Sequence, residues 1–466
     1  MRKLILGGVL AILISVPASA QTTSLKTALE ATYRNNPSLA QTREQIKNLD
    51  EGVVQALAGL KPTVGATLSS SITDPINPAT VALDQDSYSN TATLSISQLI
   101  YDGGQTRGKV DSAKFALFAG REDLIAAEQA TMLSAITAFM NLREAQAKLG
   151  LAENNISVLR EQLRASQDRF EVGEVTRTDV SQTEARLASA ISNKEASRAV
   201  VLGAIATYVS VVGEKPSSLR SPPVHPKIPS SLAKAEAIAV ENHPRVRAAA
   251  LDLRAAGVDL MVARKNRIPT VTGSASATSS ASQESFNFIQ GKTRSVSVGI
   301  DATIPIYSGG KINSSRRAAT NAKKAGQYAL QVAQDTTRLN LRSNFANWQA
   351  AEAAIRASQA QIRAARIAFE GVNEEAKLGA RTTLDVLDAE QELLSARSNL
   401  VSALRDEQVQ AYNVLAEMGL LTSDALKLDV AAYDPAVNYN KVVNEASPLG
   451  LKRINLLEKL QKRRKK

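Results

Sequence analysis

The chain has 466 residues, of which 44% are hydrophobic and 4% aromatic, with no Cys and two His. Without a thiol, disulfide frameworks, cysteine nucleophiles and thiolate metal sites are excluded, and His225 and His243 alone do not suggest a histidine-rich metal centre or a catalytic dyad. The formal net charge is +11, but residues 441–466 carry nine Lys and Arg against two Glu, a net charge of +7. Because the excess lies in this tail, we expect no nucleic-acid partner. We also expect no cofactor and no resident metal.

Residues 1–20 have the pattern of a secretory signal peptide. Arg2 and Lys3 precede an apolar stretch of 13 residues, Leu4 to Val16, and Ala18-Ser19-Ala20 offers small residues for cleavage. The stretch is shorter than the ~20 residues of a membrane-spanning helix. No later apolar run reaches ~18 residues, so the sequence predicts that the exported chain enters a membrane only as β-structure.

The mature chain is predicted to hold two copies of one unit, residues 24–214 and 231–421, joined by a Pro-rich linker at 215–230. Each copy is predicted to contain, in order, a helix, a strand pair, a long helix, a turn and a second helix. The matching landmarks are Asn35-Asn36-Pro37 with Asn242-His243-Pro244, displaced by 207 residues, and Tyr101-Asp102-Gly103-Gly104 with Tyr307-Ser308-Gly309-Gly310, displaced by 206 residues.

The strand pairs are predicted at 64–73 with 90–99 and at 270–278 with 294–305, and the loops between them, 74–86 and 279–293, are expected to face outside. Apolar residues alternate with Ser, Thr or Gly over about ten residues in each window, as in a tilted transmembrane strand with one face to lipid. The alternative is an amphipathic sheet on a soluble core. Four strands cannot close a barrel, which needs about eight, so the chain is expected to share strands with copies of itself.

The long helices are predicted at 108–172 and 314–378, where no Pro occurs. Apolar residues recur every seven positions, as at Leu142, Leu149 and Ile156, which is typical of coiled-coil packing. Gly173 and Gly379 suit the left-handed conformation that ends a helix. Second helices at 179–212 and 385–419 would complete two antiparallel hairpins, and 422–466 is expected to be a C-terminal segment with a disordered basic tail.

Two carboxylates lie directly after the second tip turn. Asp385 and Asp388 are three residues apart and therefore share one helix face. Thr382 and Asp385 have the spacing of a capping box, so Asp385 is a candidate helix cap. In an oligomer the two carboxylates would also form a ring that favours cations and can bind a polyvalent cation, with Arg381 near enough to offset their repulsion. The roles of cap and gate can coexist.

The Asn-Asn-Pro helix opening, the Tyr-Asp-Gly-Gly corner and the tip sequences 172–180 and 379–388 together resemble the TolC family of outer-membrane factors, including its BepC-type members, from Ser24 to about Leu421. This resemblance implies an α+β membrane protein that is a homotrimer. Four strands per protomer would form a 12-stranded transmembrane β-barrel, continued by a coiled-coil α-helical barrel. The implied location is the outer membrane of a Gram-negative bacterium, with a periplasmic helical extension.

The resemblance also implies partners and a gate. A periplasmic adaptor and an inner-membrane RND or ABC transporter would dock at the tip, and drugs, detergents, bile salts or proteins would pass. Asp385 and Asp388 match the carboxylates of the pore gate, while Arg381, Thr178 and Asp179 match the set of contacts that holds the tip closed. The chain has Ala376 where the best-known family member has a tyrosine, so that contact is expected to be absent or replaced.

The function implied is a passive exit duct that makes and breaks no bond. The alternative is a trimeric coiled-coil structural protein or adhesin of the outer membrane. An exported hydrolase is a third interpretation, but the sequence has no Gly-x-Ser-x-Gly motif to support it. His225 in the linker and His243 beside Pro244 are expected to have turn or packing roles.

Overall fold

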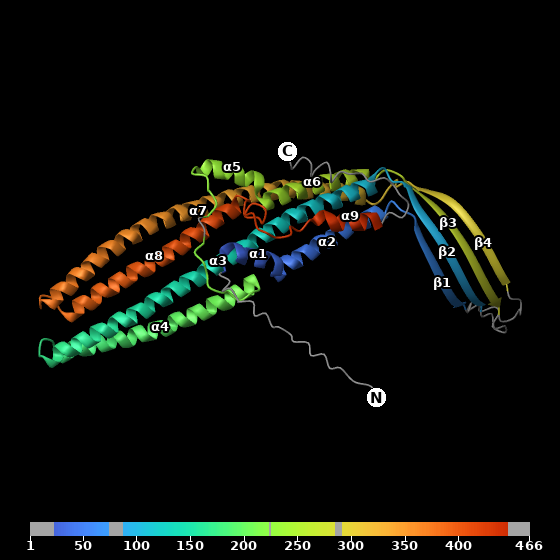
Figure 1. The fold of residues 1–466 in the computed structure, drawn as a ribbon. Helices are drawn as coiled ribbons and strands as arrows, with labels where there is room; N and C mark the ends of the chain where they lie inside the picture. Colours follow the sequence, from blue (N-terminus) through green and yellow to red (C-terminus); the bar gives the residue numbers. More distant parts are fainter. Residues whose placement is uncertain (1–22, 74–86, 223–224, 285–290, 446–466) are drawn as a thin grey trace, which may run out of the picture.

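The protein is elongated, with a curved β-sheet at one end and paired helices running away from it (Figure 1). The computed structural model describes residues 23–73, 87–222, 225–284 and 291–445, so the predicted signal peptide, the loop 74–86 and the tail from residue 446 lie outside the described residues. The elements are α1 (Leu25–Asn35), α2 (Pro37–Ala58), β1 (Thr63–Thr73), β2 (Ser87–Tyr101), α3 (Gln105–Glu171), α4 (Arg177–Val212), α5 (Leu232–Asn242), α6 (Pro244–Lys265), β3 (Thr270–Glu284), β4 (Gly291–Thr303), α7 (Lys311–Lys377), α8 (Thr383–Glu417) and α9 (Pro435–Glu445).

Two helices precede each strand pair, where one was predicted. Asn36 is extended, and its side-chain oxygen accepts hydrogen bonds from the backbone N–H groups of Ser38 and Leu39, which caps α2. The following Pro37 stands at the first position of α2, where its missing N–H costs nothing, and it disfavours a helical conformation for Asn36. His243 has the same extended backbone before Pro244, and its Nδ1 accepts from the Arg245 N–H.

The four strands form one antiparallel sheet in the order β1-β2-β3-β4. Alternate apolar side chains are strongly exposed in the protomer: Leu68 on β1 is 84% exposed and Val298 on β4 is 82% exposed. The expected loop at 279–293 is shorter than predicted, because Ser279 pairs with Arg294 and Ser282 pairs with Gly291 in the β3–β4 ladder. Backbone pairing between neighbouring strands has overridden the polar composition of this stretch.

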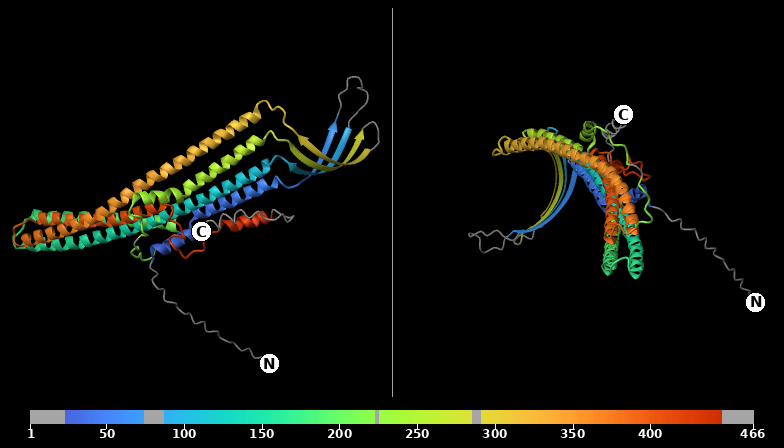
Figure 2. Two further views of the ribbon diagram at one scale, coloured as in Figure 1. Left: turned by 90° about the horizontal axis from the view of Figure 1, so that it is seen from above. Right: turned by 90° about the vertical axis from the view of Figure 1, so that its left-hand side faces the viewer.

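The long helices α3 and α7 have 67 residues each, which corresponds to roughly 100 Å. Near the sheet the neighbouring helices lie in the order α2-α3-α6-α7, and further away α4 and α8 replace α2 and α6 beside the long helices. The end view shows that the elements follow an arc (Figure 2). The heptad residues Leu142 and Ile156 are buried, but Phe170, at the end of the same series, is 44% exposed in the protomer.

The largest buried cluster lies where α1, α3, α4 and the C-terminal part of the chain meet. In the C-terminal segment, for which no element was predicted, α9 packs against α2. The Asn438 amide donates to the fully buried carboxylate of Asp50 at 2.8 Å, and the guanidinium of Arg121 lies 3.7 Å from the same carboxylate. Burial of the carboxyl is the main reason that the pKa of Asp50 is raised.

The two histidines have packing partners, as expected for structural roles. His225 lies 3.0 Å from Glu407, and this hydrogen bond raises its pKa. The His225 ring also meets the edge of Trp348, at 5.9 Å between centroids. His243 is buried near the end of α8, where burial lowers its pKa to about 4.

One helix after the leader has the length and composition of a membrane-spanning helix, although no continuous apolar run of ~18 residues was found in the sequence. Among the residues described, α4 contains an 18-residue window with a mean hydropathy of 1.4, of which 11% is buried in the protomer. The window is interrupted by polar residues that the search for a continuous apolar run did not tolerate. α4 packs along α3 as the second arm of a hairpin, but most of this window is exposed in the protomer.

Candidate functional site at the hairpin tips

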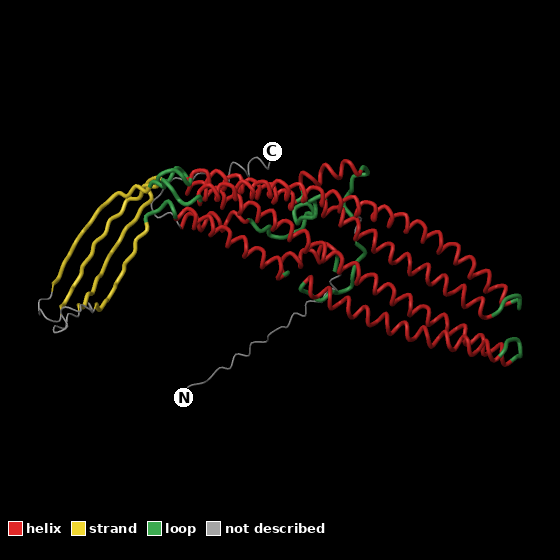
Figure 3. Tube along the Cα trace, turned by 180° about the vertical axis from the view of Figure 1, so that it is seen from behind, coloured by secondary structure: helices red, strands yellow, loops and turns green. Residues whose placement is uncertain are grey.

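Both helical hairpins end at the pole of the molecule opposite the sheet (Figure 3). At the first tip Gly173 has a φ of +79°, and at the second tip Gly379 has a φ of +78°. In each turn the backbone N–H after the glycine donates to a carbonyl five residues earlier: Glu174 to Arg169 and Ala380 to Glu375, both at 2.9 Å. This pairing satisfies carbonyls left open at the end of a helix, and the left-handed residue it needs is most easily a glycine.

The helix that leaves each tip begins with a reciprocal cap. Thr176 and Asp179 cap α4, and Thr382 and Asp385 cap α8. At the second tip the Asp385 carboxylate accepts from the Thr382 N–H at 3.0 Å and from the Thr382 hydroxyl at 2.9 Å. These hydrogen bonds, the backbone one first, lower the pKa of Asp385. The predicted capping box is therefore present, and one oxygen of Asp385 is committed to it.

Asp388 faces a different partner. Its Oδ1 lies 2.8 Å from Nη2 of Arg186 on α4, so this ion pair joins the first hairpin to the second. Arg186 is not among the tip residues predicted from the sequence. No local pattern could have found it, because the two residues are 202 positions apart.

The residues expected to hold the tip closed are not brought together within one protomer. Arg381 pairs with Glu375 at 2.9 Å, across the turn of its own hairpin. Thr178 and Asp179 lie at the other tip, and in the described part of the chain neither has a hydrogen bond or ion pair with Arg381. Asp179 instead caps α4 together with Thr176, and the Thr178 side chain is exposed.

Ala376 is buried near the end of α7, and its backbone makes a contact between the two hairpins. Its carbonyl oxygen accepts a hydrogen bond from Nη1 of Arg169 on α3, at 3.3 Å. Arg169 and Arg186 thus both extend from the first hairpin to the second. Arg169 was also missed in the sequence, although it stands directly before the tip turn.

A buried carboxyl lies close to Asp388 along α8. Glu390 on α8 is 7% exposed, and its Oε2 has no hydrogen-bond partner among the described residues. Burial raises its pKa to about 7. The position with the same place in the other copy, Glu184 on α4, is exposed.

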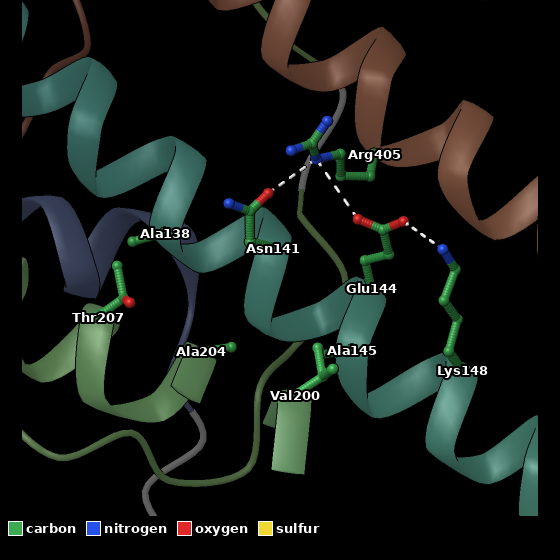
Figure 4. A pocket seen from close by; sticks show the side chains of 9 residues that line it. All are labelled: Ala138, Asn141, Glu144, Ala145, Lys148, Val200, Ala204, Thr207 and Arg405. Atoms are coloured by element: carbon green, nitrogen blue, oxygen red, sulfur yellow. Dashed lines mark hydrogen bonds and ion pairs between the residues drawn. The ribbon is translucent and has the colours of Figure 1, made fainter. Parts of the chain in front are cut away.

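Midway along the hairpins α8 is attached to α3 by a polar network (Figure 4). Nε of Arg405 lies 2.8 Å from Oδ1 of Asn141 and 3.5 Å from Glu144, and Glu144 also pairs with Lys148 at 2.8 Å. Every charged side chain of this group has an opposite charge beside it. Within the described residues no cluster of three or more His, Asp or Glu side chains could hold a metal ion.

Solved structures with this fold include outer membrane proteins and outer membrane channels. The outer membrane protein VceC of Vibrio cholerae matches with a TM-score of 0.71 and 20% identity, covering 85% of this chain and 96% of that one. The CmeC outer membrane channel of Campylobacter jejuni matches with a TM-score of 0.73 and 16% identity, covering 91% of this chain and 89% of that one. These likenesses show that the chain has the fold of these outer membrane proteins.

The model of the family "Outer membrane efflux protein" matches residues 28–213 and 237–418. The outer membrane efflux protein BepC of Brucella suis biovar 1 (strain 1330) is 35% identical over 426 residues, which are 91% of each chain. The proteases secretion protein PrtF of Dickeya chrysanthemi is 27% identical over 92% of this chain and 95% of its own length. The chain belongs to the outer membrane efflux protein family, and the TolC-family resemblance predicted from its motifs is confirmed.

Proposed function

We propose that three copies of this chain form a passive exit duct, in which twelve strands close a transmembrane barrel and the helices continue it as a periplasmic tunnel. The main support is the sheet. It has four strands, its two outer strands β1 and β4 have no further partner among the described residues, and its alternate side chains are apolar and exposed. Such edges are not tolerated in lipid, where each backbone N–H and C=O needs a partner.

The duct is proposed to conduct and not to catalyse. Energy for transport would come from an inner-membrane RND or ABC transporter, joined to the tip through a periplasmic adaptor protein. The names of relatives include both an efflux protein and a proteases secretion protein. The proposal therefore covers both exported drugs or bile salts and exported proteins. The barrel is proposed to be surrounded by outer-membrane lipid.

The gate is proposed to lie at the tip, where Asp385 and Asp388 of three protomers would surround the axis. Both side chains lie within the first two turns of α8, and Asp388 is 59% exposed in the protomer. Six carboxylates around a narrow opening would attract cations and slow their passage. Arg381, Thr178 and Asp179 are proposed to make contacts between protomers, since they do not meet within one.

The proposal is tested by recording single channels from the purified mature protein in planar bilayers. We expect small cation-selective currents, which a trivalent cation added on the tip side blocks. The variant carrying Asp385→Ala and Asp388→Ala should conduct more and lose the block. A wild-type protein that adds no conductance at all would contradict the duct, and unchanged block in the variant would contradict the gate alone.

A further inference from the structure

We propose that Arg186 is the positioning residue of the gate: by pairing with Asp388 it holds the two hairpins of one protomer together at the tip. This inference rests on the proposed function and assigns the closing contact to a residue outside the predicted set. Its basis is the 2.8 Å ion pair between Arg186 on α4 and Asp388 on α8.

Few ion pairs join the α3–α4 hairpin to the α7–α8 hairpin. Among the residues that the structure describes, two ion pairs connect α3–α4 with α7–α8: Arg405 with Glu144 midway, and Arg186 with Asp388 near the tip. Leu387, next to Asp388 in α8, packs against apolar residues of α3 and α4, including Leu159 and Ala190. Of these two ion pairs, the one between Arg186 and Asp388 is the nearer to the tip.

The two gate carboxylates have different duties in the protomer. Asp385 binds the start of its own helix through Thr382, so it stays with α8 however the hairpins move. Asp388 has its hydrogen bond on the other hairpin, so that bond must break when the hairpins separate. Asp388 is therefore the carboxylate whose charge becomes uncompensated on opening.

The strength of the contact suits a latch that has to release. The side chains of Arg186 and Asp388 are 44% and 59% exposed, and exposed ion pairs are weak and sensitive to salt. Three such pairs around one axis would act together, so their combined loss can shift a closed-to-open equilibrium about tenfold although each is small. Arg169 also joins the two hairpins, because it donates a hydrogen bond to the Ala376 carbonyl. This contact involves no charged group on the second hairpin.

The first test is single-channel recording of Arg186→Ala, Arg186→Lys and the exchange Arg186→Asp with Asp388→Arg. We expect Arg186→Ala to raise the resting open probability about tenfold and to shift the salt dependence of opening, with the Lys variant close to wild type and the exchange restoring closure. The matched control is Arg198→Ala on the same helix, since within the described residues the ion pair of Arg198 is with Glu195 of α4 itself; the open probability of this variant should not change.

A second measurement is independent of conduction and uses the absence of Cys from the chain. Spin labels at Glu171→Cys and Ala380→Cys, one on each hairpin, report the separation of the tips in trimers diluted with unlabelled protein. Arg186→Ala should lengthen and broaden this distance, and Arg198→Ala should not. If Asp388→Ala opens the channel but Arg186→Ala changes neither currents nor distances, the role of Arg186 is wrong while the duct stands; if no variant conducts, the duct is wrong and the distance alone decides on Arg186.

Discussion

The two hairpin tips have the same backbone and opposite chemistry. Both turns place a glycine at positive φ and both start the next helix with a Thr–Asp capping box. The first tip then presents arginines outward, Arg169 and Arg186, whereas the second presents the acceptors that receive them. The comparison teaches that the shared pattern builds the turn, while the residues that differ between the copies make the contact between the hairpins.

The largest expected effect is a loss of stability at a buried position of the second hairpin, compared with an exposed position at its turn. Leu387→Ala should lower the free energy of unfolding by about 3 kcal/mol, because this buried side chain fills the space between the hairpins. The measurement is denaturant unfolding in detergent, followed by helical circular dichroism. Leu378→Ala, at a side chain that is 86% exposed at the turn, is the control and should cost little in the protomer; equal losses would show that Leu387 does not join the hairpins.

The next prediction concerns two glutamates at the same place in the two copies: Glu390, which is buried, and Glu184, which is exposed. The folded pKa of Glu390 is about 7, above its ordinary value of 4.5, so the folded state prefers the protonated form. Its contribution to stability is complete below about pH 4.5 and is lost as the pH rises through 7, with a difference of about 3 kcal/mol.

Glu390→Gln should therefore flatten the stability profile between pH 5 and 8 and stabilise the protein at pH 8. The matched control is Glu184→Gln, at the exposed position of the other copy. Denaturant midpoints measured at several pH values check this prediction, and parallel profiles for wild type and Glu390→Gln would refute it.

A smaller effect should be the same at both tips. Gly173→Ala and Gly379→Ala each place a side chain in the left-handed region, at a cost of about 1–2 kcal/mol. Gly371→Ala inside α7, where an added Cβ meets nothing within 4 Å, should be neutral or stabilising. Thermal midpoints of the three variants make the comparison, and a marked difference between the two tips would mean that the turns are not equivalent.

Local patterns in the sequence predicted what local forces decide. The alternating windows coincide with strands, and Gly173, Gly379 and the Thr382–Asp385 pair act within a few residues of themselves. The helix break before Pro37 was also written locally, in an Asn that caps and a Pro that begins a helix, but it was interpreted only as a helix opening.

Contacts between distant segments could not be predicted in the same way. α9 is an 11-residue helix whose place depends on Asn438 meeting the buried Asp50, 388 positions earlier. Arg186 and Asp388 meet only because two hairpins are folded side by side. The predicted contacts of Arg381 with Thr178 and Asp179 join different tips and remain a prediction about the assembled protein.

The most direct test of the central claim is the number of chains in one particle. Native mass spectrometry of the mature protein released from detergent micelles should give three chains per particle. The two open edges of the four-stranded sheet require further copies, and three is the number in the proposed 12-stranded barrel. The particle should fall apart in the variant Ser297→Pro, which removes a backbone N–H donor from the outer strand β4. A stable single chain that needs no detergent would contradict the shared barrel and the duct built on it.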